Sequence, residues 1–147
     1  MSEHVAEIIW ARTSDTFKYD EYNRAHIIRF DAGFDVNASA APAYKGDEDR
    51  MDPEEAFVAS LSSCHMLTFL AIAARKKVTV ERYVDRAVGV MEKNEDGRLA
   101  ITRVALSPRI EFAEGVFVDA ATLEKMHHSA HEHCFIANSV KTQITVE

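Results

Sequence analysis

A long apolar stretch in the middle of the chain constrains the fold more than any other feature. The sequence MDPEEAFVASLSSCHMLTFLAIAARKK at residues 51–77 predicts one helix over residues 53–76. Asp52 is a favourable N-cap, Pro53 suits the first helical position, and two glutamates follow in the first turn. The basic residues at its end suit the negative end of the helix dipole.

This helix is apolar or small around almost its whole circumference. Its large apolar residues point in every direction: Phe57, Val58, Leu61, Met66, Leu67, Phe69, Leu70 and Ile72. A helix that is hydrophobic all round must be enclosed. One modest sheet covers one side only, so we expect a second copy of the chain to cover the other. The serines, His65 and Thr68 within the stretch favour a buried helix over a membrane span.

Strand patterns lie on both sides of this helix. A turn is predicted at KNEDG, and a second helix, AATLEKMHHSAHEHC, begins after the N-cap Asp119. The order is β-β-α-β-β-α-β, which indicates an α+β fold rather than a doubly wound parallel sheet. The strands are predicted at residues 5–12, 24–30, 78–92, 98–112 and 140–146.

The composition narrows the function classes. A chain of 147 residues without a linker or an internal repeat predicts one domain over residues 1–147. The net charge is -7 and the basic residues are scattered, which argues against a nucleic acid or an anionic membrane as partner. The N-terminus lacks a signal-peptide pattern, so we expect a cytoplasmic location. In that compartment, two cysteines that meet are more often redox-active than structural.

The two cysteines are the first candidates for chemistry. Each alone is compatible with simple packing, because free cysteine is often buried as a small hydrophobe. As the only two, with one in each predicted helix, they favour a redox pair. Cys64 lies too far from Pro53 for the helix dipole to activate it, so a reactive Cys64 needs a cation from elsewhere. Arg24 and Arg50 are the candidate cations.

Two alternatives come from other classes of protein. HHSAHEHC places His127 and His131 on one helical face with Cys134 beyond them, so a metal site of these three residues, extended by His65, is one alternative. The absence of an HExxH motif favours a solvated polar face instead. The other alternative is a non-catalytic dimer whose cysteines only pack.

Two segments resemble those of a known family. DPEEAFVASLSSC resembles the helix start of the OsmC/Ohr proteins, the osmotically inducible protein C and organic hydroperoxide resistance group, and HCFIANSVKTQITVE is similar to their second-cysteine segment. YNRAHIIRFDAG and YKGDEDRMDPEE are similar to the N-terminal strands and loop of an OsmC-like subgroup. Asp52 stands where the family often has asparagine, and HCFIAN where many members have Cys-Pro-Val/Tyr-Ser. These departures indicate a divergent branch.

The resemblance implies an intertwined homodimer, in which two long central helices are wrapped by sheets from both chains. It also implies thiol-dependent reduction of organic hydroperoxides and hydrogen peroxide. Cys64 matches the family's peroxidatic cysteine and Cys134 its resolving cysteine. Glu54 matches the glutamate that helps to hold the active-site arginine. The family takes that arginine from different segments in its different branches, and we assign it to Arg24, with Arg50 as the alternative.

The chemistry implied by the resemblance uses thiols alone. No metal or organic cofactor is needed, and an external dithiol, such as the lipoyl group of a lipoylated protein, completes the cycle. An arginine close to Cys64 would favour the nucleophilic thiolate. Apolar walls from Phe57, Leu61 and Met66 would suit an organic peroxide better than a fully hydrated one.

Overall fold

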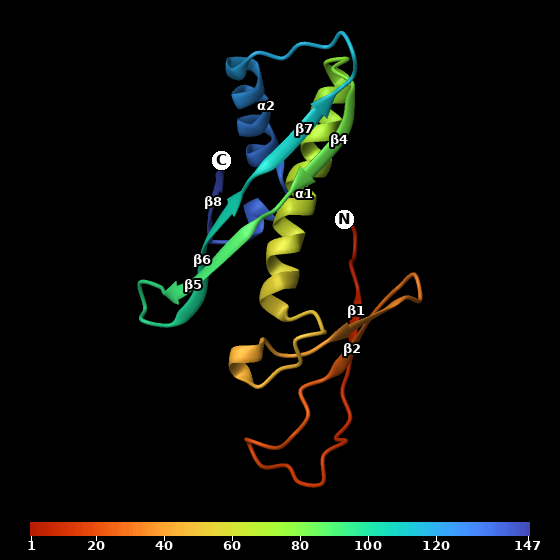
Figure 1. The fold of residues 1–147 in the computed structure, drawn as a ribbon, viewed down its shortest axis with the longest axis vertical. Helices are drawn as coiled ribbons and strands as arrows, with labels where there is room; N and C mark the ends of the chain where they lie inside the picture. The colour runs from red at the N-terminus through yellow and green to blue at the C-terminus, as the bar shows by residue number, and fades with distance from the viewer. The chain divides into compact units, whose positions relative to one another are not determined.

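The computed structural model describes all residues of the chain, 1–147, and confirms an α+β fold (Figure 1). The chain forms two compact units, Met1–Ala56 and Phe57–Glu147, called here the N-terminal and the C-terminal unit. The single domain predicted for residues 1–147 stays a prediction. The elements are β1 (Ala6–Ile9), β2 (His26–Phe30), β3 (Asp35–Ala38), η1 (Pro42–Tyr44), α1 (Pro53–Arg75), β4 (Val80–Asp85), β5 (Val88–Lys93), β6 (Leu99–Leu106), β7 (Pro108–Phe112), α2 (Ala120–His133), η2 (Ala137–Ser139) and β8 (Gln143–Val146).

The N-terminal unit is built on a three-stranded antiparallel sheet in the order β1-β2-β3. Strand β3 was not predicted, because its sequence DVNA is poor in the β-branched and aromatic residues typical of strands. Its pairing with β2 is supported by an ion pair between Arg29 and Asp35, with Nε and Oδ1 2.8 Å apart. Gly33, with a φ of 81°, makes the tight turn that brings the two strands together.

Helix α1 begins where the sequence predicted. The carboxylate of Asp52 accepts the N–H of Glu55 at 2.8 Å, which is the hydrogen bond of an N-cap. The helix ends at Arg75, one residue earlier than predicted. Lys77 follows with a left-handed φ of 58°, and the N–H of Val78 donates to the carbonyl of Ala73 at 2.9 Å. This is the hydrogen-bond pattern of a Schellman motif, with lysine at the position usually taken by glycine.

The C-terminal unit contains one long, bent hairpin. Strand β4 pairs with β7 and β5 pairs with β6, all antiparallel, and Asn94 and Gly97 close the predicted turn with a hydrogen bond of 2.9 Å. The prediction of unbroken strands over 78–92 and 98–112 is therefore wrong. The break has a physical cause: the side chain of Asp85 accepts the backbone N–H of Ser107 at 2.6 Å. That interaction takes the N–H of Ser107 out of the strand ladder, between β4 and β5 on one arm and between β6 and β7 on the other.

Helix α2 returns the chain along α1. Asp119 caps it as predicted, accepting the N–H of Thr122 at 2.7 Å, and Cys134 is its C-cap residue. Within the C-terminal unit, α2 lies beside the C-terminal half of α1 (Figure 1). The last strand, β8, then pairs with β6 in parallel.

The core of the C-terminal unit consists of two apolar clusters. One contains Phe69, Ala73, Met126 and Ala130, and the other contains Leu61, Val104 and Leu106. The buried residues of α1 follow one face at intervals of four: Leu61, His65, Phe69 and Ala73. His65 thus lies between the two clusters. By length and composition α1 could also cross a membrane, a test that the core helix of a soluble protein passes equally.

Candidate active site

The structure brings the two cysteines together, although they are far apart in the sequence. Cys64 lies in the middle of α1 and Cys134 at the C-terminus of α2, and their thiols are close enough to interact. Both are free thiols. Cys64 is half-buried, whereas Cys134 is 1% exposed. A small molecule from solvent therefore has access to Cys64 rather than to Cys134.

The surroundings of Cys134 keep it protonated at neutral pH. Burial raises the pKa of this thiol, and the interaction with the adjacent Cys64 thiol raises it further. The backbone N–H of Ala137 donates to the Cys134 sulfur at 3.4 Å and lowers the pKa in part. Because Cys134 is buried and protonated, it is suited to react only after Cys64 has reacted with a molecule from solvent.

A histidine pair lies next to the thiols. The Nε2 atom of His65 is 3.0 Å from the Nδ1 atom of His127 on α2. Their rings are nearly parallel, 11° apart, with centroids separated by 5.3 Å. Phe69 stacks on His127, with a centroid distance of 4.6 Å. This pairing of two helices through imidazoles was not predicted, although the four-residue spacing of Leu61, His65 and Phe69 was a signal that His65 faces the core.

Both imidazoles are neutral at pH 7. Burial lowers the pKa of His65 to about 4, and the nearby His127 and His131 lower it as well, while the carboxylate of Asp85 opposes them. Burial also lowers the pKa of His127. In a pair of neutral imidazoles one nitrogen donates and the other accepts, so the 3.0 Å contact is a complete hydrogen bond.

The arrangement does not support the alternative of a metal site. No group of three or more histidine, cysteine, aspartate or glutamate side chains is placed so that it could hold a metal ion. Of the residues considered from the sequence, His127 uses Nδ1 to contact His65, and the sulfur of Cys134 accepts the N–H of Ala137. His131 remains on the same helix without joining them in a ligand set.

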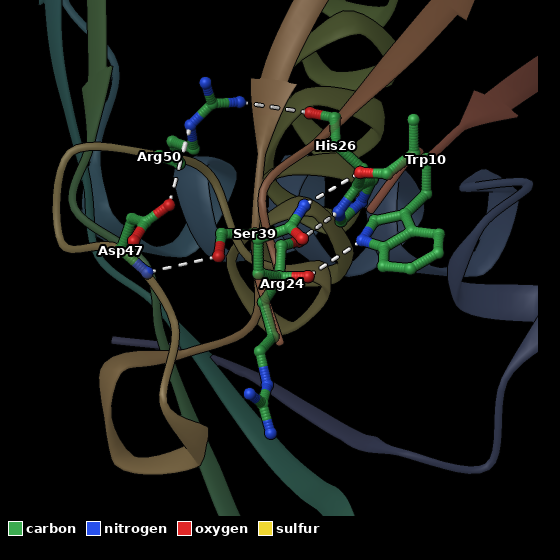
Figure 2. A network of polar contacts seen from close by, with 8 residues as sticks. Trp10, Arg24, His26, Ser39, Asp47 and Arg50 are labelled. Atoms are coloured by element: carbon green, nitrogen blue, oxygen red, sulfur yellow. Dashed lines mark hydrogen bonds and ion pairs between the residues drawn. The ribbon is translucent and has the colours of Figure 1, made fainter. Parts of the chain in front are cut away.

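Arg24 and Arg50, the candidate cations, lie in the N-terminal unit and have different partners. The guanidinium of Arg24 donates to the carbonyls of Tyr19 at 2.5 Å and Tyr22 at 2.6 Å, and its central carbon lies 3.6 Å from the centre of the Tyr22 ring. Arg24 makes no ion pair with a carboxylate. Arg50 does, because its Nε atom lies 3.8 Å from Oδ2 of Asp47. Figure 2 shows the two side chains pointing away from one another.

Glu54, in the first turn of α1, also belongs to the N-terminal unit. Its Oε2 atom is buried and has no hydrogen-bond partner. Neither Arg24 nor Arg50 forms an ion pair with it within the chain. A buried carboxylate oxygen without a partner is costly. The role predicted for Glu54, to hold an arginine, stays a prediction.

The predicted walls of a peroxide pocket lie on different surfaces of α1. Leu61 is fully buried against Val104 and Leu106, with Phe57 packed on the same cluster, and Met66 is half-buried. Their contact with a peroxide stays a prediction. A separate cavity of about 390 Å³ lies within the N-terminal unit, and its lining includes Trp10, Phe17, Tyr22, Arg24 and His26.

Comparison with known proteins gives a consistent result. The OsmC-like protein family model matches residues 46–147. The solved structure of an OsmC-like protein of unknown function from Vibrio cholerae is 49% identical, with a TM-score of 0.96, over 100% of this chain and 99% of that one. No curated protein sequence matches the chain.

More distant structures share the fold. An organic hydroperoxide resistance protein OsmC from Legionella pneumophila is 16% identical, with a TM-score of 0.73, over 100% of this chain and 95% of that one. The organic hydroperoxide resistance protein OhrB of Bacillus subtilis is 17% identical, with a TM-score of 0.63, over 97% and 96% of the two chains.

The buried His65 makes stability depend on pH. Its pKa falls from 6.5 to about 4 on folding, so the unfolded chain binds more protons between these values. The stabilisation is complete above pH 6.5 and is lost as the pH falls towards 4. We expect the free energy of unfolding to fall by about 2 kcal/mol between pH 8 and pH 5 through this group. Urea unfolding at a fixed protein concentration measures it.

His65→Gln is the control, because glutamine does not titrate. The variant should lose less stability over the same pH range than the wild type. Equal pH dependence in the two proteins would show that His65 is not the group responsible.

Proposed function

The chain belongs to the OsmC-like family, and we propose that it is a thiol-dependent peroxidase that reduces organic hydroperoxides through Cys64 and Cys134. The observation that carries the proposal is the contact of two free thiols, one accessible and one buried. The Legionella and Bacillus proteins that share the fold are named for organic hydroperoxide resistance, which supports the same substrate class.

The reaction has three balanced steps. The Cys64 thiolate attacks one peroxide oxygen, so that an S–O bond forms, the O–O bond breaks and an alcohol leaves after taking up a proton. Cys134 then attacks the sulfur of the Cys64 sulfenic acid, forming the disulfide and releasing water. An external dithiol reduces this disulfide to two thiols and is itself oxidised to a disulfide. We propose a lipoylated protein as that dithiol, in the cytoplasm.

The order of the steps agrees with the burial of the two sulfurs. Cys64 is half-buried and open to an incoming peroxide, whereas Cys134 is 1% exposed and touches Cys64. The raised pKa of Cys134 keeps it as a thiol until the sulfenic acid forms beside it. Rapid closure of the disulfide would protect Cys64 from irreversible oxidation to the sulfinic acid.

We assign the cation that favours the Cys64 thiolate to Arg24. Arg24 makes no ion pair, so its positive charge is not already neutralised by a carboxylate, whereas Arg50 is near Asp47. The unpartnered carboxylate oxygen of Glu54 is suited to hold such an arginine. Arg50 remains the alternative cation.

We further propose that the protein acts as a homodimer. Only one face of α1 is buried within the chain, and Leu67 in the middle of the helix is 61% exposed. A second copy of the chain is the partner expected to cover this apolar surface.

A peroxide-consumption assay with an excess of dithiol tests the enzymatic role. We expect Cys64→Ser to reduce the rate to that of the uncatalysed reaction, because serine cannot supply a thiolate. Without the dithiol, Cys134→Ser should reduce one equivalent of peroxide to give the Cys64 sulfenic acid. A second equivalent should oxidise this to the sulfinic acid, visible by mass spectrometry. Full activity of Cys64→Ser would exclude the proposed mechanism. A wild-type rate no faster than the uncatalysed reaction would instead leave a non-catalytic dimer with packing cysteines.

The pH profile of iodoacetamide alkylation at Cys64 tests the choice of cation. Arg24→Met should move the profile to higher pH, because the thiolate loses a stabilising positive charge. Arg50→Met is the matched control and should leave the profile in place. The opposite pattern would assign the role to Arg50.

Sedimentation at micromolar concentration tests the dimer. We expect twice the 16.5 kDa mass of the chain. A folded monomer would contradict the proposal, and Leu67→Glu should weaken the association if the exposed face of α1 forms the interface.

A further inference from the structure

Besides the thiols themselves, a pair of histidines joins the two helices that carry the cysteines. His65 follows Cys64 directly on α1, and His127 lies about two turns before Cys134 on α2. The contact between Nε2 of His65 and Nδ1 of His127 is 3.0 Å. His65 is 1% exposed, so water does not compete for this hydrogen bond.

Apart from the contact of the two thiols and the stacking of Phe69 on His127, the α1 and α2 residues of the neighbouring core cluster make apolar contacts. Phe69 and Ala73 of α1 pack with Met126 and Ala130 of α2. Apolar contacts stabilise without fixing direction, because their energy follows the area removed from water. The histidine pair differs, since a hydrogen bond requires a donor and an acceptor at one distance and angle. It is therefore the contact that can set the register of one helix against the other.

Breaking this contact inside the protein is costly. The charged and titratable groups that face the pair are Asp85 on β4 and His131 on α2. Asp85 is already engaged by the N–H of Ser107 and the hydroxyl of Ser62. If the helices shifted, the buried His65 and the half-buried His127 would each lose a hydrogen-bond partner.

We infer that the His65–His127 hydrogen bond is a positioning contact that holds Cys134 on α2 against Cys64 on α1. A disulfide requires the two Cα atoms to come within about 7 Å with suitably directed side chains. The histidine pair keeps that geometry available before any oxidation occurs. Its importance for peroxide turnover rests on the proposed function, but its effect on the two thiols does not.

Matched variants separate the hydrogen bond from the volume of the side chains. His65→Gln places an amide nitrogen near the former Nε2 and can keep the bond, whereas His65→Met has a similar shape and cannot. On α2, His127→Asn and His127→Leu form the corresponding pair. His128→Gln, at an exposed position on the same helix, is the control. The double variant His65→Met/His127→Leu leaves no imidazole without a partner, so it provides the test if a single variant does not fold.

The measured quantity is the effective concentration of the Cys64 and Cys134 thiols, from disulfide equilibria in glutathione buffers at pH 7. We expect His65→Met, His127→Leu and the double variant to lower it about tenfold. His65→Gln, His127→Asn and His128→Gln should stay close to the wild type. If the histidine pair only stabilised the fold, these variants would lower the free energy of unfolding without changing the effective concentration of the thiols in the folded protein. Values within twofold of the wild type in the folded Met and Leu variants would overturn the inference.

Single-turnover kinetics extends the test to peroxide. The rate of sulfenic acid formation at Cys64 should be unchanged in His65→Met, whereas the following disulfide closure should slow about tenfold. If glutathione forms the wild-type disulfide and peroxide does not, the proposed function fails and the positioning role stands. If neither reagent forms it, both are wrong.

Discussion

The apolar surface of α1 is the constraint on which the rest of the structure depends. The helix is too apolar to face water on any side, yet a single chain buries only the face marked by Leu61, His65, Phe69 and Ala73. The bent hairpin and α2 cover that face within the C-terminal unit. Because the proposed reactive residue lies on the same helix, the requirement to enclose α1 also decides which groups surround Cys64.

The buried face is not uniformly apolar, and its polar interruption coincides with the chemistry. His65 separates the cluster around Phe69 from the cluster around Leu61, and Asp85 breaks the hairpin through its hydrogen bond to Ser107. Polar groups in a core cost free energy unless they are paired. Here His65 pairs with His127, and Asp85 accepts hydrogen bonds from Ser107 and Ser62. The two thiols belong to the same region as this polar interruption.

Local features of this fold could be predicted from the sequence, and long-range ones could not. The start of α1 at Pro53 was predicted correctly, because a cap depends on a few neighbouring residues. The break in the hairpin was missed because it depends on Asp85 reaching Ser107, far along the chain. Spacing alone could not show that Cys64 meets Cys134, and the resemblance to a family supplied that expectation. The hydrogen bond between His65 and His127 was not predicted either, because the sequence grouped the two histidines only as ligands of an alternative metal site.

The position of Cys134 at the end of α2 determines which part of the backbone can move when a disulfide forms between the two thiols. Cys64 lies inside a continuous helix, where moving the backbone would break hydrogen bonds on both sides. Cys134 is the C-cap residue, with a non-helical ψ of 113°, and its N–H bonds only to His131. A terminal residue can change its backbone angles while only the last turn frays. Formation of the disulfide would then speed amide hydrogen exchange in the last turn of α2, while exchange in α1 around Cys64 would stay slow.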